Sequence, residues 1–144
     1  MSKGNTTEND FAKFIANATA MPSYGANLHV SLHTADPGEA GTQLTSESAY
    51  TGYARVSVAR DASGWTICLA DGTTDATGPA FKNAAEATFP ECTGGSESIT
   101  HVAIGTAASG AGQVLYKGAL TAPVAVSNLI TPRFPVGTLR TVED

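Results

Sequence analysis

The sequence predicts an all-β protein, an antiparallel jelly-roll-like β-sandwich of about eight strands with a short N-terminal helix. Apolar and polar residues alternate with a period of two from Leu28 onward, which is typical of half-buried strands. Clusters of turn residues separate these runs, and the chain contains 15 glycines. Helical spacing of apolar residues occurs only near the start. With 144 residues, a single core of this class is expected.

Residues 1–22 are expected to form an N-terminal arm that contains the helix. Thr6 or Thr7 is the predicted N-cap, and Pro22 ends the helical pattern. The apolar residues at helical spacing are Phe11, Phe14, Ile15 and Ala18. A helix of about 13 residues is marginal in isolation, so this one must dock on a surface. That surface is either its own domain or a neighbouring subunit.

Residues 23–144 are expected to form the sandwich, with no second domain. The strands follow in the order 28–33, 53–60, 65–69, 84–89, 99–106, 114–120 with a continuation at 123–126, and 136–142. In the second of these strands the alternation directs Val56 and Val58 inward together with Ala54, and Arg55 outward. Val102 and Ile104 are expected in the core. A kink is expected before Pro123.

Charge and composition argue against several classes of partner. The net charge is −5, and the eight basic residues are scattered between Lys3 and Arg140, so neither nucleic acid nor an anionic membrane is an expected partner. The chain contains neither an apolar run of about 20 residues nor a signal-peptide core at its start, which favours synthesis in a cytoplasm. Cys68 and Cys92 are expected to be reduced, buried thiols.

No residue set predicts catalysis, a cofactor or a metal. His29 and His33 lie four residues apart on a predicted strand, about 13 Å along one face, which is too far for one ion even if His101 approached one of them. The serines of Gly94–Ser98 lack the strand-to-helix elbow of a hydrolase, so a free-standing hydrolase is the weakest interpretation. Acidic side chains are expected to be solvated at Glu86, Glu91 and Glu97. We therefore expect a protein that is not an enzyme.

Five short segments in fixed order carry a family resemblance. They are Leu28–Gly38, Gly52–Arg55, Thr88–Pro90, Ile99–Ile104 and Leu115–Leu120. Together they resemble a family of small virion proteins of tailed bacteriophages that are labelled head-decoration (cement) or tail-fibre proteins. The resemblance covers roughly residues 8–140. It implies a β-sandwich that binds other virion proteins and catalyses nothing.

Within that family, the sequence favours a capsid cement protein on the outer surface of the virion. Such a protein would bind the major capsid protein as a dimer or trimer, with Phe11, Phe14 and Ile15 as the interface. Each contact can be weak, because many weak contacts on a lattice add through effective concentration. The alternative is an adhesion module of the tail or tail fibre. In that alternative, exposed aromatic rings contact host-surface glycans, and the candidate rings are Tyr50, Tyr53 and Trp65. The other interpretation of these three rings is that they pack in the core.

Overall fold

The protein is described here from a computed structural model that covers residues 1–143, so Asp144, the last residue of the predicted sandwich domain, lies outside the described residues. Within them the chain forms one helix and ten strands, and every strand pair is antiparallel. The elements are β1 (Ser2–Lys3), α1 (Asn5–Asn17), β2 (Asn27–His33), β3 (Val56–Ala59), β4 (Trp65–Cys68), β5 (Ala80–Asn83), β6 (Ala87–Thr88), β7 (Ser96–Gly105), β8 (Val114–Ser127), β9 (Arg133–Phe134) and β10 (Arg140–Val142). The predicted all-β sandwich with an N-terminal helix is confirmed.

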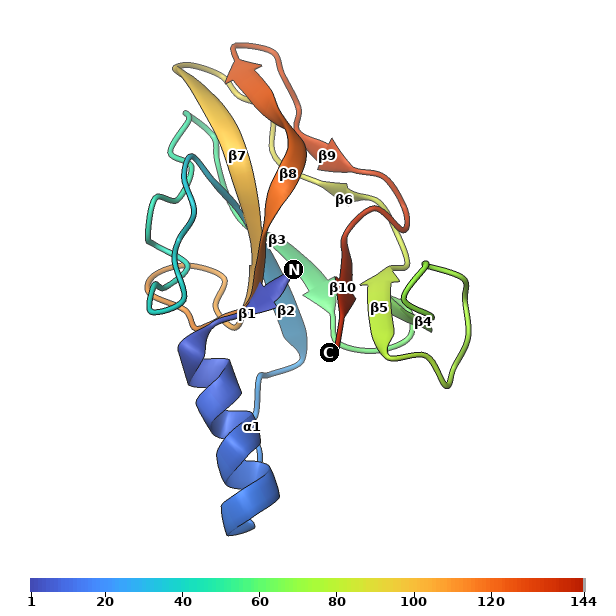
Figure 1. The fold of residues 1–144 in the computed structure, drawn as a ribbon. Coiled ribbons are helices and arrows are strands. Elements are labelled where there is room, and N and C mark those ends of the chain that lie inside the picture. Colours follow the sequence, from blue (N-terminus) through green and yellow to red (C-terminus); the bar gives the residue numbers. More distant parts are fainter. Residues whose placement is uncertain (144) are drawn as a thin grey trace.

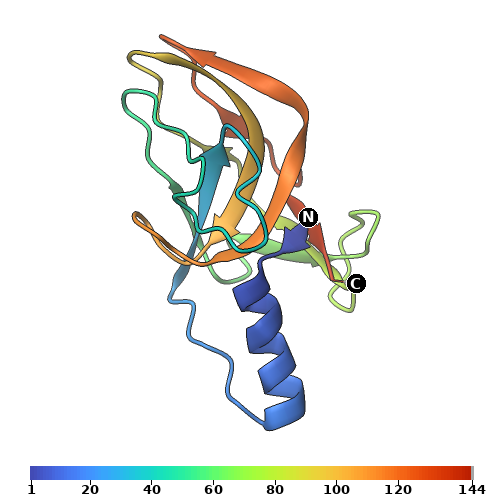
Figure 2. The same cartoon turned by 60° about the vertical axis from the view of Figure 1, so that its left-hand side comes forward.

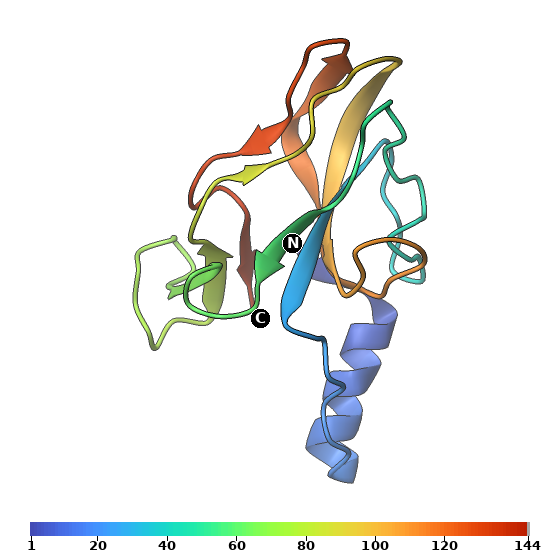
Figure 3. The same ribbon diagram turned by 180° about the vertical axis from the view of Figure 1, so that it is seen from behind.

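Three sheets enclose the core (Figures 1 and 3). The largest has the strand order β1-β8-β7-β2-β3, and it is faced by the sheets β10-β5-β4 and β6-β9. Val102 and Ile104 are buried on β7, as predicted. The core also takes side chains from the facing layer, namely Trp65, Ala87, Phe89 and Leu139. Both cysteines are free thiols with no exposed surface, as expected from the sequence.

The longest strand pair, β7 with β8, is interrupted by a large bulge. Ile99 pairs with Val124 and His101 pairs with Ala119, so Thr100 alone faces residues 120–123 of β8. An insertion of this kind bends the strand that carries it and leaves its backbone outside the ladder. β8 accordingly curves away from the sheet in its middle (Figure 2), and the kink predicted before Pro123 is confirmed.

The start of the helix differs from the prediction. The N-cap is Gly4, with extended backbone and no capping side chain, and neither threonine takes that role. Because β1 pairs with β8, the chain enters α1 directly from the sheet, and a Cβ at Gly4 would lie 2.7 Å from the carbonyl oxygen of Val114. Thr7 instead donates from Oγ1 to that carbonyl, at 2.9 Å. Ser2 and Lys3 of the predicted arm therefore belong to the main sheet.

The strand expected at 53–60 is shorter, and Ala54 and Arg55 at its start have exchanged their expected buried and exposed positions. Only β3 forms a ladder, and Arg55 is buried while Ala54 is exposed. The reason is electrostatic, because Arg55 Nε and Nη2 donate to the two carboxylate oxygens of Glu47, at 2.6 and 2.8 Å. A charged side chain is buried only where such a partner is present. The alternation of apolar and polar residues along a strand carries no information about a partner from a loop, so it could not predict that Arg55 is buried.

The expected strand at 84–89 is also wrong in detail. The chain forms β5 before this range and only the two-residue β6 within it. β5 ends at Asn83, whose side chain bonds to the segments that follow it. Its side-chain amide donates to the carbonyls of Ala85 and Pro135, and its Oδ1 accepts from Leu139 N–H. The last strand, expected over 136–142, shortens to β10 because Gly137 turns the chain with φ 76°.

The buried histidine His33 is held in a neutral form. Its Nδ1 donates to the carbonyl of Thr45 at 2.9 Å, and its Nε2 lies 2.9 Å from Ser31 Oγ, which donates to it in that tautomer. Burial lowers the pKa of His33, and the hydrogen bond to Thr45 opposes this only in part. Glu47 also opposes the shift, whereas Arg55 and His101 add to it.

This environment predicts a pH-dependent stability. As the pH falls, a histidine whose pKa is lowered in the folded state is protonated first in the unfolded chain, at its ordinary pKa of about 6.5. Protonation therefore favours the unfolded chain, and the free energy of unfolding decreases as the pH falls from about 7.5 through about 6.5. We expect the thermal midpoint to fall over this window, and the His33→Asn variant to fall less steeply. His29 has a pKa lowered by burial and contributes with the same sign, so His29→Asn serves as the comparison. An unchanged slope in His33→Asn would contradict this assignment.

Candidate interaction surface

Helix α1 projects from the β body as a separate rod (Figures 1 and 2). Of its residues only Thr7 is buried, and every residue from Phe11 to Ala20 is exposed. The chain then returns to β2 through residues 18–26. Helices of soluble domains normally pack one face on the core, so a helix exposed along most of its length is an element available to a partner.

The root of α1 is fixed to the body by polar contacts. Besides the Thr7 bond, Gln113 Nε2 donates to Thr7 Oγ1 at 3.0 Å and to Asp10 Oδ2 at 3.1 Å. The backbone N–H of Asn5 donates to the carbonyl of Glu39 at 2.9 Å. These contacts all lie in the first two turns. The C-terminal half of α1 is therefore positioned by the rigidity of the helix.

One face of α1 carries a continuous apolar stripe. Phe11, Phe14 and Ile15 occupy positions i, i+3 and i+4, Ala18 follows as the C-cap of the helix, and the three large side chains are 44, 47 and 73% exposed. We call these four residues the α1 stripe. The structure thus brings the three predicted interface residues together on one exposed face. Their role in an interface stays a prediction.

Acidic side chains flank the α1 stripe, and the basic one lies behind it. Glu8 is three residues before Phe11, and Asp10 is four residues before Phe14, so each lies beside the stripe. Lys13 is two residues from Phe11 and points roughly to the opposite side of the helix. The interaction surface therefore combines apolar side chains with a negative border.

Lys3, at the end of β1, lies beside Phe11, the first residue of the α1 stripe. Lys3 Nζ lies 5.7 Å from the centroid of the Phe11 ring and 5.9 Å from that of Tyr116. The same ammonium pairs with Glu143 at 2.6 Å, and Tyr116 Oη donates to Glu143. Sequence patterns did not single out Lys3, because its partners come from the opposite end of the chain.

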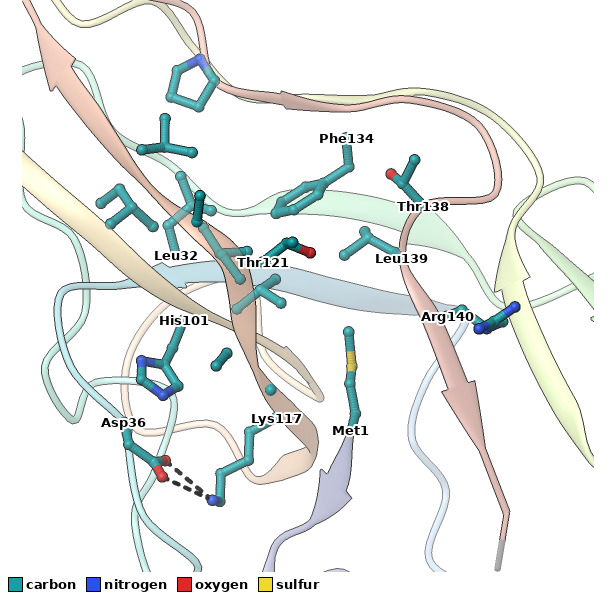
Figure 4. A pocket seen from close by; sticks show the side chains of 18 of the residues that line it. Met1, Leu32, Asp36, His101, Lys117, Thr121, Phe134, Thr138, Leu139 and Arg140 are labelled. Carbon is teal, nitrogen blue, oxygen red and sulfur yellow. Dashed lines mark hydrogen bonds and ion pairs between the residues drawn. The ribbon is translucent and has the colours of Figure 1, made fainter. Parts of the chain in front are cut away.

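A second feature is an apolar groove of about 700 Å³ beside the β8 bulge. It lies between β8 and the segment 132–140, and Figure 4 shows side chains from both walls turned towards the same hollow. We call it the β8 groove. Its apolar lining includes Met1, Leu32, Ile99, Val102, Leu120, Val124, Phe134 and Leu139. These residues come from five separate segments, so no local pattern pointed to the groove.

Charged side chains also line the β8 groove. Lys117, with 8% of its side chain exposed, pairs with Asp36 at 3.1 Å and with Glu39 at 2.9 Å. Burial alone would lower the pKa of Lys117, but its hydrogen bonds to the two carboxylates raise it, so the ammonium is charged. Two arginines, Arg133 on β9 and Arg140 on β10, are also among the lining residues. Arg133 is 65% exposed and has only a 3.9 Å contact to Glu86.

The aromatic residues considered for glycan contact lie inside the protein. Tyr50 and Trp65 are buried, and Tyr53 is half-buried. Tyr50 and Tyr53 pack edge to face at 5.3 Å, and Tyr50 Oη donates to the carbonyl of Pro90. Burial raises the pKa of Tyr50 to about 12. Of the two interpretations of these rings, core packing therefore holds, and a surface platform at these positions does not.

The acidic and histidine residues do not assemble into a metal centre. Among residues 1–143 no three His, Cys, Asp or Glu side chains are grouped so as to hold an ion. His33 faces His101 in the β2–β7 register, but its ring nitrogens are already used. Glu97, expected to be solvated, instead accepts from the backbone N–H groups of Ala49 and Tyr50. No helix in this part of the chain has the length and apolarity of a membrane span.

The comparisons with known proteins agree with the sequence resemblance. The family described as podophage GP4 fiber I protein gp80 matches residues 2–141. The match spans β1, α1, every later strand at least in part, and both surfaces described above. A search of curated proteins found no match to the chain. The chain belongs to the podophage GP4 fiber I protein gp80 family, and it is a structural protein of a bacteriophage virion.

Proposed function

We propose that this protein is a non-enzymatic subunit of a tail fibre that attaches to its neighbour in the virion through the α1 stripe. The observation that carries the proposal is the stripe itself, which places Phe11, Phe14 and Ile15 on one exposed face of a projecting helix. An exposed apolar helix face is the element used in helix-in-groove recognition. The family description, a fiber protein, supports the assignment to a fibre.

The energetics of the stripe suit an assembly contact. A fully buried Phe or Ile side chain contributes about 1.5–3 kcal/mol through the hydrophobic effect. Three such side chains offset much of the cost of associating two proteins, which is several kcal/mol. A contact of this strength is modest for one pair of molecules. It becomes stable when several subunits are joined in one particle.

A capsid cement protein is the second candidate. In that role α1 would contact the major capsid protein, and the β body would cover the outer surface of the shell. The shape favours this candidate, because a small body with one projecting helix is suited to being held at a single point on a lattice. Glycan binding through Tyr50, Tyr53 and Trp65 receives no support, since these rings are not on the surface.

The copy number in the virion separates the two candidates. We expect quantitative mass spectrometry of purified particles to find far fewer copies of this chain than of the major capsid protein, as for a fibre. Removal of tails from heads should remove it as well. A copy number comparable with the shell subunit would select the cement role instead. Absence from purified virions would contradict both.

A further inference from the structure

We propose that the β8 groove of one copy of this chain binds the α1 stripe of the next copy. The inference rests on the proposed function, in which α1 is the attachment element, and it names the neighbour as a second copy. The α1 stripe and the β8 groove are two of the exposed apolar surfaces among residues 1–143. A contact between two different surfaces of the same chain is heterologous, and such contacts build rings or filaments.

The position of α1 requires the contact to join two molecules. The helix leaves the body at Gly4 and points away from it in all three views (Figures 1–3). Thr7, on the same helix face as Phe11, is hydrogen-bonded to β8 and fixes this direction. The stripe therefore cannot fold back into its own groove while the root is intact. A groove on another copy has no such restriction.

The size and chemistry of the groove match the stripe. A hollow of about 700 Å³ lies within the range in which pockets bury most of a drug-sized ligand, so it has room for several apolar side chains. Its floor includes Leu32, Ile99 and Val102, which are already part of the core, and its β8 wall is exposed at Ala122 and Val124. Phenylalanine and isoleucine side chains can pack against the apolar part of this lining.

The charges at the two surfaces are complementary. Glu8 and Asp10 flank the stripe, whereas Arg133 and Arg140 are among the residues that line the groove. Lys13, the one basic residue of α1, lies on the opposite face of the helix and would stay outside the contact. Elsewhere along the groove, Lys117 pairs with both Asp36 and Glu39, so two carboxylates there share one ammonium. Complementary borders of this kind select the partner and fix its orientation.

Charge exchange in the purified full-length protein tests the pairing. Sedimentation velocity of the wild type is expected to show assembly that increases with concentration above the 14.6 kDa monomer. Glu8→Arg and Arg133→Glu should each weaken assembly about three- to tenfold, and the double variant should return to within about twofold of wild type. Lys13→Glu is the matched control on the same helix and should leave assembly unchanged.

A mixing experiment tests the heterologous geometry. Phe14→Asp removes the stripe, and Ala122→Arg blocks the groove at an exposed position. Each variant alone should be monomeric, with circular dichroism showing that it is folded. Mixed together they should form a one-to-one dimer, because one copy supplies a groove and the other a helix. Failure of the mixture to associate would overturn the inference.

Two further results separate this inference from the proposed function. If the wild type is monomeric at every concentration while particles still require Phe14, the second-copy contact is wrong and attachment through α1 stands. If Ala122→Arg blocks incorporation into particles without changing self-association, another virion protein occupies the groove and the inference is also overturned. If the copies assemble through stripe and groove but the chain is missing from virions, the proposed function fails and the inference stands.

Discussion

Replacing Arg55 with leucine is expected to lower the free energy of unfolding by about 3–5 kcal/mol, because it leaves the carboxylate of Glu47 buried without its counter-ion. The arginine side chain is 2% exposed and the glutamate side chain 11%. The guanidinium also donates to the carbonyls of Ala107 and Gly110, at 2.8 and 2.7 Å. Urea titration followed by tryptophan fluorescence measures the change through Trp65.

Arg133→Leu is the matched control for this experiment. Arg133 is 65% exposed and 3.9 Å from Glu86, so the same substitution there should change the unfolding free energy by less than about 0.5 kcal/mol. A double variant, Arg55→Leu with Glu47→Leu, should cost less than the sum of the two single changes, since neither charge is then left unpaired. Equal losses in Arg55→Leu and Arg133→Leu would show that the buried pair is unimportant.

The Arg55 network also bears on the position of α1. Its two carbonyl acceptors lie in the loop between β7 and β8, immediately before Gln113. Gln113 in turn holds Thr7 and Asp10 at the root of the helix. The β7–β8 loop, which Arg55 holds at one point and which ends at Gln113, thus links the buried ion pair to the root of the projecting helix. Loss of Arg55 is expected to loosen the helix root as well as the loop.

The features that the sequence predicted well are those with a local physical cause. A period of 3.6 or 2 depends only on neighbouring residues, so the α1 stripe and the core positions Val102 and Ile104 were identified before any tertiary contact was known. The buried thiols of Cys68 and Cys92 were expected because a free cysteine behaves as a small hydrophobic residue. What the sequence left open is the surface on which α1 docks, because that depends on contacts between segments.

The features that the sequence did not predict depend on partners from distant segments. Gly4 replaces the expected threonine cap because the N-terminal strand pairs with β8, more than 100 residues away. Arg55 is inside because Glu47 meets it from a loop, although alternation points it outward. The β8 groove requires the bulge at residues 120–123 and the crossing segment 132–140. The spacing of apolar residues along the sequence predicts neither of them.

Phe14→Asp is expected to exclude the protein from assembled virions. The substitution places a carboxylate in the middle of the α1 stripe, between two acidic flanks, and it removes an apolar side chain worth about 1.5–3 kcal/mol when buried. The loss of that burial, with the cost of desolvating the new charge, weakens attachment at least tenfold, since each 1.4 kcal/mol is a factor of ten. In cells that produce wild-type and variant chains equally, particles should contain less than about a tenth as much variant.

Ala16→Asp provides a control with the same charge on the same helix. Ala16 is two residues from Phe14, so it points roughly to the opposite side of α1, and it is exposed. It changes helix propensity more than Phe14→Asp does, because alanine is the best helix former, and yet it should leave incorporation near the wild-type level. Point substitutions test the helix more cleanly than deletion of residues 1–21, since that deletion would also remove β1 and the Thr7 contact. Equal incorporation of Phe14→Asp and Ala16→Asp would show that the virion holds this protein by a surface other than the α1 stripe.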